Sequence, residues 1–166
     1  MNLNRVILME LSFLINNVSV FYVLQLVCCA FMTGLIWIVQ ILHYPSFTFV
    51  NEDQFPKFHE FHTNRISYIV MPIMLIELVT AVVLIVLNQK SISLFLNILF
   101  LITIWISTFF LSVPLHNDLA NNRSLISINR LIHTNWYRTF LWTIRLCILS
   151  YVFLKALEVN NVNFSN

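Results

Sequence analysis

Long runs of apolar residues, separated by polar connections of unequal length, dominate the pattern along this chain. A helix needs about 20 mostly apolar residues to cross the hydrocarbon core of a bilayer. Four runs are long enough, and they lie at residues 18–42, 66–87, 92–113 and 137–157. The pattern therefore predicts an all-α fold, a four-helix transmembrane bundle. The expected partner of this bundle is the lipid bilayer around it.

The connections between the runs predict how the spans are arranged. Only residues 88–91 join the second run to the third, so these two spans are expected to be antiparallel neighbours. The connections at 43–65 and 114–136 are long, and with four spans both must lie on the same side of the membrane. We expect short interfacial helices in these long connections, an interfacial segment at residues 1–17 and a flexible tail at 158–166.

The two long connections resemble each other, which suggests that the bundle is built from two helix-loop-helix halves. In each half a span that holds a tryptophan ends near a proline, Pro45 or Pro114, because proline does not continue a helix comfortably. Both connections close with His-Thr-Asn, at 62–64 and 133–135. The repeat indicates one unit used twice about an axis along the membrane normal, with coincidence as the alternative.

Composition agrees with a membrane protein and narrows its function. Of the 166 residues, 59% are hydrophobic and 10% are charged, whereas a soluble domain carries about 25% charged residues. The single glycine, Gly34, excludes glycine-rich phosphate loops and dinucleotide fingerprints. The net charge of +2 gives no reason to expect a nucleic acid. The three cysteines all lie in apolar runs and predict neither a disulfide framework nor a metal-binding pair.

All the histidines fall toward the side of the two long connections. His59 and His62 are three residues apart, so they project from neighbouring turns of one helix face. Imidazole suits Zn, Cu or Fe, and the candidate metal ligands are therefore His59, His62, His116 and His133. Histidines among lipid headgroups, or histidines that carry protons, would explain the same pattern without a metal.

Ionisable residues also occur inside the apolar runs. Glu77 lies near the middle of the second span, where a charged residue costs about 2.5–3.5 kcal/mol on insertion scales. Arg145 lies in the fourth span, which enters the membrane from the same side as the second span, and it is the expected partner of Glu77. Arg138, Trp142 and Arg145 share one helix face, and guanidiniums beside an indole can hold a phosphate or carboxylate. Anchoring of Arg138 to lipid phosphates is the alternative.

These observations predict a polar cavity between the spans, near the side of the long connections. It would bind a metal ion or an anionic or amphiphilic headgroup. The candidate ligand-binding residues are Gln40, Tyr44, Glu77, Asn135, Arg138, Trp142 and Arg145.

Several motifs in the chain, taken together, can be compared with those of a known protein family. The motifs are Trp37-x-x-Gln40-x-x-x-Tyr44-Pro45, Pro72-x-Met74 with Glu77, Ser112-Val113-Pro114-x-His116, and Asn135-Trp136-x-Arg138-Thr139-x-x-Trp142-x-x-Arg145. Together they resemble a family of small four-span bacterial integral membrane proteins of unknown function. The resemblance covers about residues 37–145 and implies a four-helix membrane fold in a bacterial inner membrane, but no activity.

The sequence favours one orientation in the membrane and leaves several functions open. Five Lys and Arg residues lie on the side of the long connections and three on the opposite side, which favours long connections in the cytoplasm and termini outside. Three functional hypotheses remain. The protein binds a ligand or cofactor, an enzyme or redox component included. It is an accessory or assembly subunit of a larger membrane complex. Or it is a small proton-coupled transporter that uses Glu77, for which a homodimer would be needed.

Overall fold

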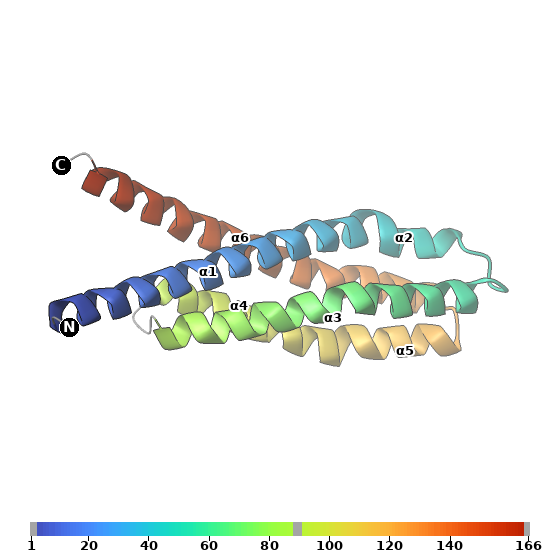
Figure 1. Ribbon diagram of the computed structural model, residues 1–166. Helices are drawn as coiled ribbons and strands as arrows, with labels where there is room; N and C mark the ends of the chain where they lie inside the picture. Colours follow the sequence, from blue (N-terminus) through green and yellow to red (C-terminus); the bar gives the residue numbers. More distant parts are fainter. Residues whose placement is uncertain (1–2, 88–90, 165–166) are drawn as a thin grey trace.

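The computed structural model describes the backbone of residues 3–87 and 91–164 and the side chains of residues 18–87 and 91–156. The described residues form helices and no strands, and four helical rods are long and apolar enough to cross a membrane (Figure 1). The prediction of an all-α four-helix membrane bundle is confirmed. The elements are, in chain order, α1 (Leu3–Ile38), the π-helix η1 (Val39–His43), α2 (Tyr44–Ser46), the 3₁₀-helix η2 (Phe47–Phe49), α3 (Phe55–Leu87), α4 (Ile92–Ser107), the π-helix η3 (Thr108–Ser112), α5 (Val113–Asn121) and α6 (Leu125–Phe164).

The rods lie side by side along most of their length. The start of α1 and the end of α6 lie at one end of the bundle, where α3 also ends and α4 begins, and the connections from α2 to α3 and from α5 to α6 lie at the other end (Figure 1). This is the up-and-down order expected from one short and two long connections. We call the end with the two long connections the connection end.

Most of each long connection continues a membrane helix. Helix α3 begins at Phe55 and α6 begins at Leu125, so both start well before the apolar runs that predicted them. Pro56 is tolerated in the first turn of α3, because the backbone N–H groups there have no partner within the helix. The short helical pieces of the first connection are α2 and η2. Helix α6 also continues to Phe164, into the stretch expected to be a tail, and α1 is helical from Leu3.

Two π-helices occupy matching positions in the two halves, each just before a proline. Proline lacks a backbone N–H and its ring clashes with the carbonyl four residues earlier. A π-helix relieves this conflict by shifting the bonding to the carbonyl five residues back. Tyr44 accordingly donates its backbone N–H to Val39, and Val113 does the same in the second half, to Thr108. The matching π-helices support a bundle built from two similar halves better than the repeated His-Thr-Asn triplet does.

The His-Thr-Asn triplets do not present equivalent side chains to the interior. In the first triplet His62 is buried and Asn64 is exposed, whereas in the second His133 is exposed and Asn135 is buried. The two helices are therefore rotated differently about their own axes, and the triplet match does not predict matching roles.

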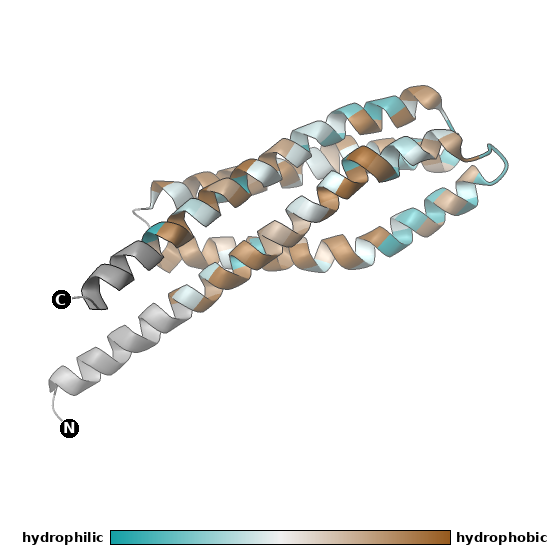
Figure 2. Ribbon diagram, turned by 90° about the horizontal axis from the view of Figure 1, so that it is seen from above, coloured by the Kyte–Doolittle hydropathy of each residue, from teal (hydrophilic) through white to brown (hydrophobic). Residues whose placement is uncertain are grey.

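The polarity of the bundle suits a lipid environment. Many large apolar side chains face outward, while Gln25, Glu77, Asn97 and Arg145 are completely buried. Figure 2 shows hydrophobic residues along the middle of the rods and hydrophilic residues gathered toward the connection end. In the bilayer, such an arrangement places apolar atoms against the acyl chains and polar groups where they find partners inside the protein.

Candidate functional site

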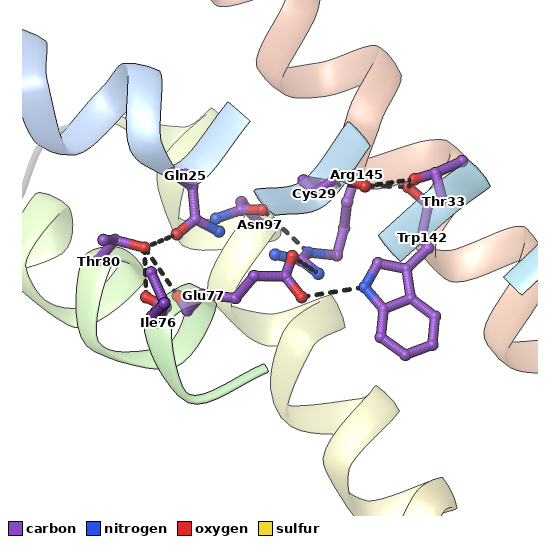
Figure 3. A network of polar contacts seen from close by, with 9 residues as sticks. All are labelled: Gln25, Cys29, Thr33, Ile76, Glu77, Thr80, Asn97, Trp142 and Arg145. Carbon is purple, nitrogen blue, oxygen red and sulfur yellow. Dashed lines mark hydrogen bonds and ion pairs between the residues drawn. The ribbon is translucent and has the colours of Figure 1, made fainter. Parts of the chain in front are cut away.

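A buried ion pair joins two spans in the middle of the bundle. Arg145 Nη1 lies 2.8 Å from Glu77 Oε1, and both side chains are 0% exposed. Trp142 Nε1 donates a hydrogen bond to the other carboxylate oxygen, Glu77 Oε2, at 3.2 Å (Figure 3). The expected pairing of Glu77 with Arg145 is thus observed. Because the two charges cancel, this deep cluster has no net demand for an external ion.

Polar residues that the pattern analysis did not single out complete the deep cluster. Arg145 Nε donates to Asn97 Oδ1 at 3.0 Å, and Thr80 donates to Gln25 (Figure 3). Asn97 is a lone amide inside the third apolar run, so its unusual place in the sequence was the signal that could have identified it. The side-chain amides of Gln25 and Asn97 each keep a buried nitrogen without a hydrogen-bond partner.

A second polar cluster lies nearer the connection end and is centred on Arg138. Its Nη2 atom donates to Asn135 Oδ1 at 2.5 Å and contacts the Tyr44 hydroxyl at 3.5 Å. Asn135 in turn donates from Nδ2 to Gln40 Oε1 at 2.8 Å. The π-helix η1 carries Gln40, and Tyr44 follows it directly, so the widened turn places both residues toward α6. Four of the predicted ligand-binding residues therefore form one network.

Histidines extend this network toward the surface. The Tyr44 hydroxyl lies 3.1 Å from His116 Nε2, and His116 Nδ1 lies 3.0 Å from His59 Nε2. A second pair, His43 Nε2 and His62 Nδ1, is separated by 2.6 Å. The rings of His62 and His116 lie with centroids 5.8 Å apart, so the two pairs adjoin. The cluster joins residues from all of the first three rods.

The predicted set of metal ligands is not assembled. His133 is exposed on α6 and makes none of the ring contacts that join the other histidines, whereas His43, which was not in the set, is part of the cluster. Among the described residues, no group of three or more His, Cys, Asp and Glu side chains is arranged to hold a metal ion. Instead, His43 bonds to His62, and His116 bonds to His59 and to Tyr44.

A cavity of about 160 Å³ lies between the four rods and connects the two polar clusters. Its polar lining residues include Tyr44, His62, His116 and Arg138. It is also lined by Trp142, whose indole donates the hydrogen bond to Glu77. The rest of the wall is mainly apolar and includes Met32, Leu35, Ile36, Val39, Val70 and Met74. An apolar cavity of about 150 Å³ is large enough for benzene, so this space suits a small molecule or one end of a larger one.

Two polar atoms of residues that line the cavity lack hydrogen-bond partners. Arg138 is 7% exposed and its Nε has no hydrogen-bond partner, and the same holds for His62 Nε2, whose ring is also buried. No carboxylate among the described side chains pairs with Arg138, whereas Arg145 pairs with Glu77 and Arg123 with Glu52. Guanidinium keeps its proton in proteins, so the cavity carries an uncompensated positive charge.

No family model, curated protein or solved structure matches this chain. Membership of the family of four-span bacterial proteins that its motifs resemble stays a prediction. The functional argument therefore rests on the cavity and its residues.

Proposed function

We propose that this integral membrane protein binds a small amphiphile with an anionic head in the cavity between its four spans. One observation carries the proposal: Arg138 is a buried cation at a cavity wall, with no carboxylate partner among the described side chains. A buried unpaired charge is costly, and an anionic ligand would supply the missing partner.

The surroundings of Arg138 suit such a ligand. A carboxylate or phosphate group can accept hydrogen bonds from the guanidinium and from the neighbouring imidazoles, and charge-assisted bonds of this kind contribute about 1.5–3 kcal/mol each. His62 lines the same cavity, and its Nε2 atom has no hydrogen-bond partner. The methionine and aliphatic wall then accepts the apolar part of the molecule.

Removal of the guanidinium tests the proposal. We expect Arg138→Gln to weaken binding of para-bromobenzoate about tenfold to a hundredfold, because one or two charge-assisted hydrogen bonds are lost. Bromine quenches indole fluorescence at short range, and Trp142 lines the cavity. The measurement is a quenching titration of purified protein in which Trp37, Trp105 and Trp136 are replaced by phenylalanine.

The matched control is Arg130→Gln, which removes an exposed arginine from the same helix and should leave binding unchanged. The neutral analogue para-bromobenzamide should bind more weakly than the benzoate to the unsubstituted protein. Equal binding of benzoate and benzamide, or normal binding by Arg138→Gln, would contradict an anion site.

The alternatives from the sequence receive less support. A proton-coupled transporter would use Glu77, but this carboxylate is completely buried and is held by Arg145 and Trp142. An assembly subunit needs outward-facing apolar side chains for its partners, and contact with lipid accounts for the same side chains. A transition metal would require a ligand set that the described residues do not form.

We also propose that the connection end faces the cytoplasm of a bacterial inner membrane, following the excess of Lys and Arg there. In a Cys147→Ser background, a membrane-impermeant maleimide added to intact cells should label Ile92→Cys and spare Asn51→Cys until the cells are permeabilised. Both positions are exposed, at opposite ends of the bundle, and Cys28 and Cys29 are buried. The reverse labelling pattern would place the connection end outside.

A further inference from the structure

We infer that the ligand enters the cavity sideways, from the headgroup layer of the bilayer, through a groove between α3 and α5. The inference rests on the proposed function, since it concerns how the ligand reaches the same cavity. It also narrows the ligand class to an amphiphile that resides in the membrane, with its head at Arg138 and its tail directed toward the lipid.

The groove is a second hollow, of about 270 Å³, and it adjoins the cavity. Four residues line both spaces: Ile66 and Ser67 from α3, and Val113 and His116 from α5. The two spaces therefore share a wall of four side chains, of which Ser67 and Val113 are exposed on the outer face of the bundle. Small displacements of these side chains would join the two spaces.

The depth of the groove matches the boundary between lipid tails and headgroups. On the polar side of it lie Thr63 and Asn117, which line the groove. On the apolar side lie exposed Ile69 and Phe110, and Tyr68 is 77% exposed at the level between them. Tyrosine is enriched at the membrane–water interface, so an opening here would face the headgroups of the surrounding lipids.

Three residues of the wall between the groove and the cavity favour its opening. Ser67 is small and exposed, and Val113 is the first residue after the π-helix η3, where Pro114 removes a backbone hydrogen bond. The imidazole of His116 bonds to His59 on the groove side and to Tyr44 on the cavity side. It thus offers an incoming anionic head a polar contact between the groove and Arg138.

Filling the groove without touching the cavity tests the route. Ala120 and Asn117 line the groove and not the cavity, so Ala120→Phe and, separately, Asn117→Phe should obstruct entry and leave the binding site intact. The probe is α-bromopalmitate in lipid vesicles that contain the protein with Trp142 as its single tryptophan. We expect each variant to slow the quenching rate about tenfold, equivalent to a barrier about 1.4 kcal/mol higher, with the same final extent. Ala156→Phe is the control, because Ala156 is exposed at the opposite end of the bundle.

The outcomes separate the route from the site. Slower quenching by α-bromopalmitate with an unchanged rate for water-soluble para-bromobenzoate supports lateral entry from the membrane. Equal slowing of both probes overturns the membrane source, and unchanged rates for both groove variants overturn the route. If quenching is saturable and is lost in Arg138→Gln while the route fails, the proposed function stands. If no saturable quenching occurs in the protein that has Trp142 as its single tryptophan and Arg138 intact, the proposed function itself fails.

Discussion

Replacement of Glu77 by leucine is expected to lower the free energy of unfolding by about 3–5 kcal/mol, the cost of leaving a buried charge without its partner. Arg145 lies 2.8 Å from the Glu77 carboxylate, and both side chains are 0% exposed. Trp142 would lose its hydrogen-bond acceptor at the same time. Thermal unfolding of the purified protein in detergent measures the effect.

A double-variant cycle shows whether the cost comes from the unpaired charge. Arg145→Met alone should also destabilise, and the combination of Glu77→Leu with Arg145→Met should recover much of the loss, because apolar replacement of a whole buried pair is often neutral or stabilising. Glu60→Gln, at an exposed position on the same helix, is the control. A Glu77→Leu protein within about 1 kcal/mol of the unsubstituted one would mean that the pair does not hold the deep cluster together.

Replacement of Asn135 by aspartate is expected to weaken anion binding about tenfold to a hundredfold and to change the stability of the ligand-free protein little, because a new ion pair with Arg138 offsets the lost hydrogen bond from Asn135 Nδ2 to Gln40 Oε1. Asn135 Oδ1 already accepts a hydrogen bond from Arg138 at 2.5 Å. A carboxylate at this position would supply the counter-charge that the guanidinium lacks and would repel an incoming anion, which removes a charge-assisted interaction worth about 1.5–3 kcal/mol. The quenching titration with para-bromobenzoate measures binding, and thermal unfolding measures stability.

The chain contains a matched control for this variant. Asn64 belongs to the other His-Thr-Asn triplet but is exposed, so Asn64→Asp adds the same charge away from the cavity and should change neither quantity. Normal binding by Asn135→Asp would show that Arg138 does not receive the anion. The two predictions affect different measured quantities. Loss of the Glu77–Arg145 pair lowers the free energy of unfolding, whereas a change beside Arg138 weakens anion binding.

The hydropathy of the chain was sufficient to predict the number of spans, their antiparallel order and the common end of the two long connections. These features depend on apolar runs of about 20 residues, which any sequence displays directly. The pairing of Glu77 with Arg145 was also predictable, since a carboxylate at mid-membrane needs a partner and few charges reach that depth. The lengths of α3 and α6 were less accessible, because polar residues at a membrane boundary suit a helix and a connection equally well.

Only the tertiary structure decided which histidines meet and where the cavity lies. A π-helix inserts one residue into the turn, and each residue advances the helix by about 100°, so the residues after η1 and η3 point in directions that an ideal helix would not give. This rotation contributes to the cluster that contains His43 and His116, while His133 faces outward from a triplet that looks equivalent in sequence. The sequence alone determined that ionisable groups would lie inside the bundle; the rotation and packing of four helices against one another decided which of them share a cavity, because that depends on contacts between residues far apart in the chain.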